Sequence, residues 1–179
     1  MFDLVFFDIE TYSPGGKPTV NDKIITITYS INDASPIILK EWNSSEKKIL
    51  EKFLNLIKKM ERPVIIGHNI FGFDIPAIIT RASGYGLGSI FELNTLFTSN
   101  FVVDTIQCLL PSNNMRFNGL GLTNCGEKMG TINNTCHGRL ICNHYENSNW
   151  AEIIDHNVMD VIMTRDLYNL LTKSNYIPF

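Results

Sequence analysis

The first forty residues combine apolar runs with the alternation that β-strands require. Residues 2–9 form an apolar and aromatic run interrupted by two aspartates, which predicts a mostly buried strand. Residues 23–31 alternate, and residues 36–39 follow an Asn-Asp turn signal. Consecutive strands usually pair, so we expect three neighbouring, antiparallel strands. One face of the second strand is expected to carry Ile25, Ile27 and Tyr29, opposite Thr26 and Thr28.

Helical spacing takes over after residue 45. Apolar residues recur every three or four positions from Ile49 to Met60, behind a capping serine at Ser44 or Ser45. Further on, short apolar strands alternate with helical patterns, which predicts an α/β sheet with some parallel pairing. The later strands are expected at residues 64–66 and 101–103. The later helices are expected at residues 75–82, starting at residue 104, within residues 119–130 and at residues 150–171.

Composition limits the class of protein. The chain has 179 residues, of which 44% are hydrophobic and 18% charged, and this favours one folded domain spanning residues 1–179 over a disordered segment. A net charge of −3 excludes a strongly basic protein that coats duplex DNA by charge alone. The chain starts without a basic leader, has no uninterrupted membrane-length apolar stretch and has too few cysteines for a disulfide scaffold. We therefore expect a soluble, cytoplasmic protein without membrane contact.

Three separate segments place acidic or histidine side chains beside predicted apolar elements. Asp8 and Glu10 are two residues apart at the end of the first strand, so both point to one face, where a divalent cation can compensate their charges. Asp74 falls at the start of a helix, and His156 and Asp160 share one face of the last helix. Each signal also has an ordinary structural explanation: a solvated strand end, a helix cap, and a surface salt bridge.

Taken in order, these segments resemble the motifs of the DEDD, or DnaQ-like, 3′→5′ exonucleases, which have the ribonuclease H-like fold. Phe7–Thr11 (FDIET) resembles the first motif, and His68–Asp74 (HNIFGFD) resembles the second in its family B polymerase proofreading form. Asp104–Gln107 (DTIQ) resembles a helix start between the second and third motifs. His156–Tyr168 (HNVMDVIMTRDLY) resembles the third motif, so the resemblance covers nearly the whole chain.

The third motif departs from the family pattern in one respect. One subfamily has tyrosine four residues before the aspartate, and the other has histidine five residues before it. Here His156 lies four residues before Asp160, which combines the spacing of the tyrosine subfamily with the chemistry of the histidine subfamily. Whether His156 acts as a general base or only orients water therefore stays open.

The resemblance implies both a fold and a reaction. The fold would be a mixed five-stranded sheet, three antiparallel strands followed by two parallel ones, flanked by helices. The reaction would be hydrolysis of phosphodiester bonds at the 3′ end of single-stranded nucleic acid, assisted by two Mg²⁺ or Mn²⁺ ions. Asp8, Glu10 and Asp160 would hold one ion. Asp8 would bridge to a second ion near Asp74, and His156 would orient the attacking water and accept its proton.

The second motif is where this family places the terminal nucleotide, which makes Asn69 and Phe73 candidate substrate-binding residues, with Thr11 beside the same pocket. Phe73 can stack on a base, but a position in the hydrophobic core explains it equally well. Basic residues are scattered, so contact with only a few nucleotides is expected. DNA is slightly favoured over RNA, and a polymerase or a repair protein is a candidate partner.

Other functions fit parts of the same pattern. A non-catalytic nucleic-acid-binding module is disfavoured because all four carboxylates are present, and a ribonuclease H-type endonuclease is disfavoured by the pair His156 and Asp160. A zinc site is an alternative for a group of thiols and imidazoles before the last helix, although this group lacks the paired spacing of typical zinc ligands. The group comprises Cys125, Cys136, His137, Cys142 and His144.

Overall fold

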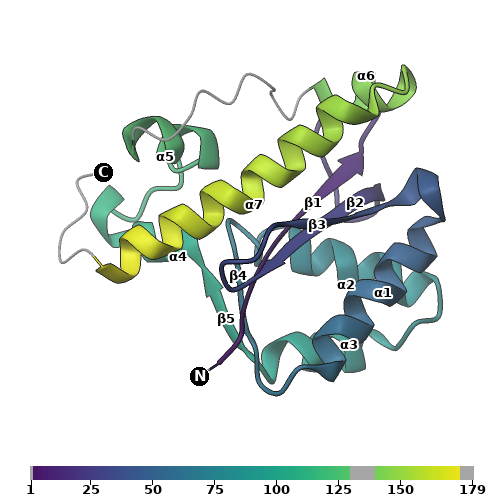
Figure 1. The fold of residues 1–179 in the computed structure, drawn as a ribbon, viewed down its shortest axis with the longest axis horizontal. Helices are drawn as coiled ribbons and strands as arrows, with labels where there is room; N and C mark the ends of the chain where they lie inside the picture. Colours follow the sequence, from purple (N-terminus) through teal and green to yellow (C-terminus); the bar gives the residue numbers. More distant parts are fainter. Residues whose placement is uncertain (1, 130–139, 174–179) are drawn as a thin grey trace.

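A single mixed sheet forms the centre of the molecule (Figure 1). The computed structural model describes residues 2–129 and 140–173. The strand order is β3-β2-β1-β4-β5, with antiparallel pairing from β3 to β1 and parallel pairing from β1 to β5. The predicted arrangement of three antiparallel strands followed by two parallel ones is confirmed. The strands are β1 (Leu4–Tyr12), β2 (Lys23–Ile31), β3 (Ile37–Lys40), β4 (Val64–Gly67) and β5 (Phe101–Asp104).

Helices cover both faces of the sheet. The long helix α7 crosses one face, over β1 and β2, whereas α1 and α2 lie on the other (Figure 1). Within the part of the chain that the structure describes, no helix is both long and apolar enough to cross a bilayer. The helical elements are η1 (Glu41–Asn43), α1 (Glu46–Lys59), α2 (Asp74–Gly84), α3 (Ile90–Thr98), α4 (Thr105–Leu109), η2 (Pro111–Asn113), α5 (Leu122–Met129), α6 (Ile141–Glu146) and α7 (Trp150–Lys173).

The main hydrophobic core lies between the sheet and helices α1 and α2. Phe7 on β1 and Phe53 on α1 are fully buried, and their ring centroids are 5.0 Å apart. Burying one such side chain contributes about 1.5–3 kcal/mol. Helix α1 begins at one of the two predicted caps, because Ser45 Oγ accepts a hydrogen bond from the N–H of Lys48. The sheet is thus anchored on this side, and α7 covers the other.

The pairing of β1 with β2 is irregular between Glu10 and Thr11, and the register leaves Ile25 on β2 without a paired residue. The extra residue shifts the alternation of side chains by one position. As a result, Ile25 packs with residues of α6 and α7. The prediction that Ile25 shares a face with Ile27 and Tyr29 is therefore wrong, because those two pack in the main core on the opposite side.

Candidate active site

Strand β1 supplies the first two acidic side chains of the site. Asp8 and Glu10 are partly buried, and Glu10 lies directly at the irregular pairing with β2. Irregularities of this kind redirect side chains and are common beside active sites. Because β1, β4 and β5 are parallel, the segments that follow their carboxyl ends gather at one edge of the sheet.

The turn between β4 and α2 brings a third carboxylate to this edge. Asp74 is the first residue of α2 and is 5% exposed. Its Oδ1 accepts a hydrogen bond of 3.2 Å from the backbone N–H of Ile9, so the side chain reaches across to β1. The explanation of Asp74 as a plain helix cap is wrong, since Phe73 occupies the N-cap position.

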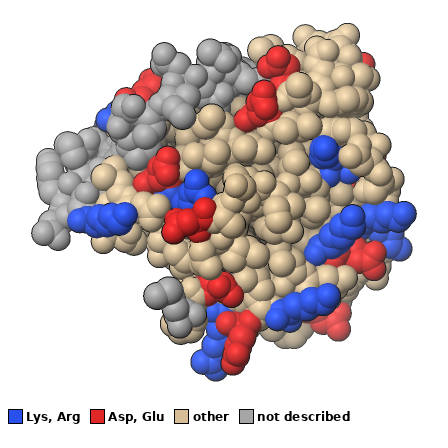
Figure 2. Space-filling view, viewed as in Figure 1, with Lys and Arg blue, Asp and Glu red and all other residues tan. Residues whose placement is uncertain are grey.

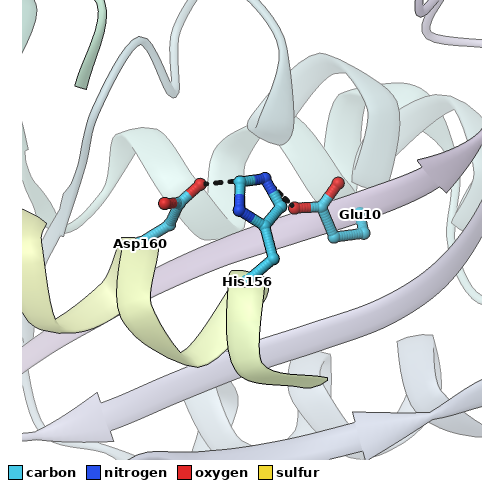
Figure 3. Close-up of side chains that lie close together, drawn as sticks. All are labelled: Glu10, His156 and Asp160. Atoms are coloured by element: carbon cyan, nitrogen blue, oxygen red, sulfur yellow. Dashed lines mark ion pairs between the residues drawn. The ribbon is translucent and has the colours of Figure 1, made fainter. Parts of the chain in front are cut away.

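Helix α7 contributes the remaining two side chains, which share one face as their spacing predicts. Figure 3 shows the imidazole of His156 between the carboxylates of Glu10 and Asp160. His156 Nε2 lies 3.4 Å from Glu10 Oε1 and 3.7 Å from Asp160 Oδ2. Ligand atoms of these three residues all lie within 4.8 Å of one another, which is close enough to share one metal ion. His156 is 7% exposed, so the group is largely screened from water.

An open cleft of about 490 Å³ lies over the site. Three of the predicted metal ligands, Asp8, Asp74 and Asp160, line this cleft. So do the two second-motif residues that were predicted to bind substrate, Asn69 and Phe73. Phe73 also packs against the main core. It is therefore both a residue that lines the cleft and a residue that contributes to the hydrophobic core.

A second pocket, of about 310 Å³, adjoins the cleft at Pro18, which lines both. Glu10 and Thr11 lie in this second pocket. Thr11 is buried, and its Oγ1 is 2.9 Å from the Oγ of Ser13. Thr11 therefore borders the cleft from the adjoining pocket, whereas Asn69 and Phe73 line the cleft itself.

Burial raises the pKa values of all four carboxyl groups. Desolvation is the largest cause in each case. The pKa of Asp74 is raised to about 8 and that of Asp160 to about 7. The pKa values of Asp8 and Glu10 are also raised well above their usual range, with a further contribution from neighbouring carboxylates. Such a group ionises fully at neutral pH only when cations compensate it, and hard carboxylate oxygens are the donors that Mg²⁺ and Mn²⁺ prefer.

Asp104 has a role that sequence reasoning recognised only in part. It caps α4 as predicted, because its carboxylate accepts the N–H of Ile106 at 3.1 Å. The same buried carboxylate also accepts the backbone N–H of Asn69 at 2.7 Å and of Phe71 at 3.1 Å. Asp104 thus holds the turn that carries the second motif. The DTIQ pattern in the sequence identified the helix start but not these contacts.

The backbone of this turn explains two further residues of the second motif. Asn69 has a φ of +63°, in the left-handed region that asparagine tolerates better than most residues. A β-carbon at Gly72 would lie 2.4 Å from Asn69 Oδ1, so glycine there leaves room for the asparagine side chain. The turn is therefore shaped to present Asn69 beside the cleft.

His68 lines the cleft but is occupied with structural hydrogen bonds. Its Nε2 lies 2.7 Å from the carbonyl oxygen of Leu120, and its Nδ1 lies 2.8 Å from Thr105 Oγ1. Burial lowers the pKa of His68, which favours the neutral ring. Both ring nitrogens of His68 thus have hydrogen-bond partners within the fold.

The cysteines and histidines before α7 form no zinc cluster within residues 2–129 and 140–173. Cys125 is fully buried in a hydrophobic cluster, and burial raises its pKa to about 11. Cys142 Sγ accepts the backbone N–H of Ser13 at 3.0 Å. Cys136 and His137 lie outside the described residues.

The sheet order and the acidic cleft define a ribonuclease H-like, DnaQ-like exonuclease fold. The structure aligns with a family B DNA polymerase from the archaeon Pyrobaculum calidifontis at a TM-score of 0.73, over 96% of this chain and 25% of that chain. The two sequences are 19% identical, so this likeness shows the fold alone.

The sequence model for the exonuclease domain of DNA polymerase family B matches residues 2–178, and the chain belongs to this family. It is 32% identical over 92 residues to a DNA polymerase of Pyrococcus glycovorans and 35% identical over 85 residues to one of Archaeoglobus fulgidus. Each alignment covers 47% of this chain. The chain corresponds to a small part of these relatives, because the alignments cover 12% and 10% of their own lengths.

Proposed function

We propose that this chain is a metal-dependent 3′→5′ exonuclease that hydrolyses single-stranded nucleic acid, with DNA favoured over RNA. The observation that carries the proposal is the meeting of four carboxylates and one histidine, from distant segments, at one edge of the sheet, where Asp8, Asp74 and Asp160 line the cleft. Membership in the polymerase exonuclease-domain family supports the reaction and its direction. The relatives are named as DNA polymerases, which supports DNA as the substrate.

The donor set fits two Mg²⁺ or Mn²⁺ ions. When bound, they would neutralise charge on the phosphate and lower the pKa of the attacking water. We assign Asp8, Glu10 and Asp160 to one ion, since β1 and α7 bring Glu10 and Asp160 to His156 and the carboxylate of Asp8 is close enough to both of theirs to be repelled by them. Asp74 and the shared Asp8 are assigned to the second ion, because both line the cleft.

His156 is assigned the role of orienting the attacking water and accepting its proton at Nε2. This atom lies between the carboxylates of Glu10 and Asp160, which are assigned to the ion that would carry this water (Figure 3). Histidine changes charge near neutral pH, which suits a general base. A positioned group of this kind contributes about 10²–10⁴-fold to rate.

The 3′ end of the strand is assigned to the side of the cleft formed by Asn69 and Phe73, with Thr11 at its border. Lys17 lines the same cleft and supplies a basic side chain for phosphate. On the face seen in Figure 2, basic side chains gather mainly over α1 at the right, whereas those over α7 are interspersed with acidic ones. This distribution supports contact with a few terminal nucleotides.

We further propose that residues 1–179 act as one exonuclease domain and that its partner is a polymerase or a repair protein. Parallel β4 and β5 and helix α7 all contribute to the cleft or its support, so the site requires most of the chain. Removal of α7 would remove both His156 and Asp160.

The direct test is degradation of matched DNA and RNA oligonucleotides carrying a 5′ label, in Mg²⁺ or Mn²⁺. We expect a ladder that shortens from the 3′ end, faster on DNA, and abolished by a blocked 3′ end. The control variant Asp155→Asn, at an exposed acid on the same helix, should retain full activity. Internal cleavage would indicate an endonuclease, and retardation without cleavage would indicate a binding module; either result would overturn the proposal.

A further inference from the structure

A buried polar cluster beneath the site links three elements of the fold. Asn157 on α7 is completely buried, and its Nδ2 donates a hydrogen bond of 2.6 Å to Asp8 Oδ2 on β1. Its Oδ1 accepts hydrogen bonds from Thr26 Oγ1 at 2.8 Å and from Thr28 Oγ1 at 2.5 Å, both on β2. Both threonines are also completely buried. A single side chain therefore connects a proposed metal ligand to the neighbouring strand.

The partners of Asn157 fix the direction of its amide. An ionised carboxylate can only accept hydrogen bonds, so Asp8 selects the NH₂ end of the amide, while the hydroxyls of Thr26 and Thr28 donate to the oxygen. Rotation of the amide would leave buried polar groups without hydrogen-bond partners, which is unfavourable. The amide donates its hydrogen bond to Asp8 Oδ2, so Asp8 Oδ1 is the carboxylate oxygen that is not bonded to Asn157.

We infer that Asn157 is a positioning residue of the site, which sets the direction of the Asp8 carboxylate toward the cations. Through Thr26 and Thr28 it also fixes α7 over the sheet, and α7 carries His156 directly before Asn157. This inference rests on the proposed function, because it concerns the cations that the function requires. Groups that orient metal ligands in this way are worth about 10–100-fold in metal affinity.

The test is Mn²⁺ binding to the full chain without nucleic acid, measured by calorimetry on wild type and Asn157→Leu. We expect binding about 10–100-fold weaker in the variant. Because leucine leaves two buried hydroxyls without their acceptor, a second variant combines Asn157→Leu with Thr26→Val and Thr28→Val. Replacing both partners of a buried hydrogen bond by apolar groups of similar shape is nearly neutral for folding, so this triple variant, which removes the threonine hydroxyls together with their acceptor, should fold and still bind Mn²⁺ weakly.

Ser30→Ala is the matched control. Ser30 is buried on the same strand, two residues beyond Thr28, and its hydroxyl has no hydrogen-bond partner among the described residues. The Ser30→Ala variant should bind Mn²⁺ as tightly as the wild-type chain does. In the oligonucleotide assay, the kcat of the triple variant should fall, whereas its KM should stay within about 3-fold of the wild-type value. The reason is that the proposed role of Asn157 concerns the cations rather than contacts with the substrate.

The outcomes separate this inference from the proposed function. Wild-type Mn²⁺ affinity in the triple variant would overturn the inference and leave the proposed function standing. An equal loss of Mn²⁺ affinity in Ser30→Ala and in the triple variant would also overturn the inference. Any substitution of a buried residue on β2 would then weaken Mn²⁺ binding, whether or not it affects Asn157. A wild-type chain without Mn²⁺ affinity would overturn both.

Discussion

Asp8 is the residue at which the proposed chemistry opposes the stability of the fold. Burial and three neighbouring carboxylates raise its pKa, and only the hydrogen bond from Asn157 lowers it. In the absence of cations, an ionised Asp8 therefore costs free energy of folding. In the proposed function the same carboxylate is a metal ligand, so it would contribute to cation binding rather than to the stability of the metal-free fold.

This conflict predicts opposite effects of Asp8→Asn on activity and stability. Loss of a ligand charge should remove several kcal/mol of transition-state stabilisation, so hydrolysis should fall on the order of 10³-fold. Relief of about 1 kcal/mol of repulsion should raise the melting temperature of the metal-free protein by about 2–4 °C. Thermal unfolding in a chelator, with exposed Asp155→Asn as the control, checks the second point. A clearly lower melting temperature would contradict it.

His156→Ala should separate catalysis from binding. If His156 Nε2 accepts the proton of the attacking water, kcat should fall about 10²–10⁴-fold while KM stays within about 3-fold. Steady-state kinetics on a short DNA oligonucleotide supply the measurement. Turnover at the wild-type rate would show that the imidazole, although it lies between Glu10 and Asp160, takes no part in the reaction.

Sequence patterns located the proposed metal ligands better than the residues that support them. Asp8, Asp74 and Asp160 were identified from motif order, and they do line one cleft. Asn157 stands beside His156 in the third motif, but its role depends on contacts with Thr26 and Asp8, more than a hundred residues away. Spacing along the chain gives no signal for such contacts, so only the folded structure reveals them.

At the scale of elements, the turn between β4 and α2 depends on a side chain from β5. Asp104 receives three backbone N–H groups, two from this turn and one from α4. Because hydrogen bonds to a buried charged acceptor are strong, Asp104→Ala should cost about 2–4 kcal/mol. The melting temperature should fall by about 5–15 °C, whereas Asp33→Ala at an exposed turn should change little. Equal stability of the two variants would show that the turn between β4 and α2 does not depend on its hydrogen bonds to Asp104.

Element prediction succeeded where the pattern was long and local. Helices α1 and α7 follow from periodicity in the sequence, whereas the five-stranded arrangement of the sheet was implied by the family resemblance. Helix α3 was missed although Ser89 and Glu92 form a complete capping box at its start, a signal that was available. Helix α6 has only 6 residues and is held by tertiary contacts, such as Tyr12 Oη donating to Glu146 and Tyr145 packing on Trp150. Its local sequence therefore carries little information.

At the scale of the molecule, the raised pKa values predict that the metal-free protein loses stability as pH rises. The unfolded chain releases its carboxyl protons near pH 4, whereas the folded site retains protons up to about pH 7 at Asp160 and about pH 8 at Asp74. Between these limits the folded state binds more protons, so the free energy of unfolding falls with increasing pH.

Melting temperatures in a chelator should accordingly be lower at pH 8 than at pH 5, and saturating Mn²⁺ should remove or reverse the difference. Glu46, whose pKa is lowered chiefly by its hydrogen bonds to Arg81 and the backbone despite burial, is ionised in both states across this range and does not mask the effect. The variant Asp8→Asn should show a flatter dependence. A metal-free protein that is more stable at pH 8 would contradict the assignment of the raised pKa values.

The central claim, that these carboxylates hold paired cations, is tested most directly by anomalous diffraction from crystals of the full chain grown with Mn²⁺ and a mononucleotide. We predict two Mn²⁺ peaks about 3.5–4 Å apart in the cleft, both in contact with Asp8. One peak should also contact Glu10 and Asp160, and the other should lie toward Asp74. Well-ordered crystals in which saturating Mn²⁺ leaves the cleft without a peak would contradict the account.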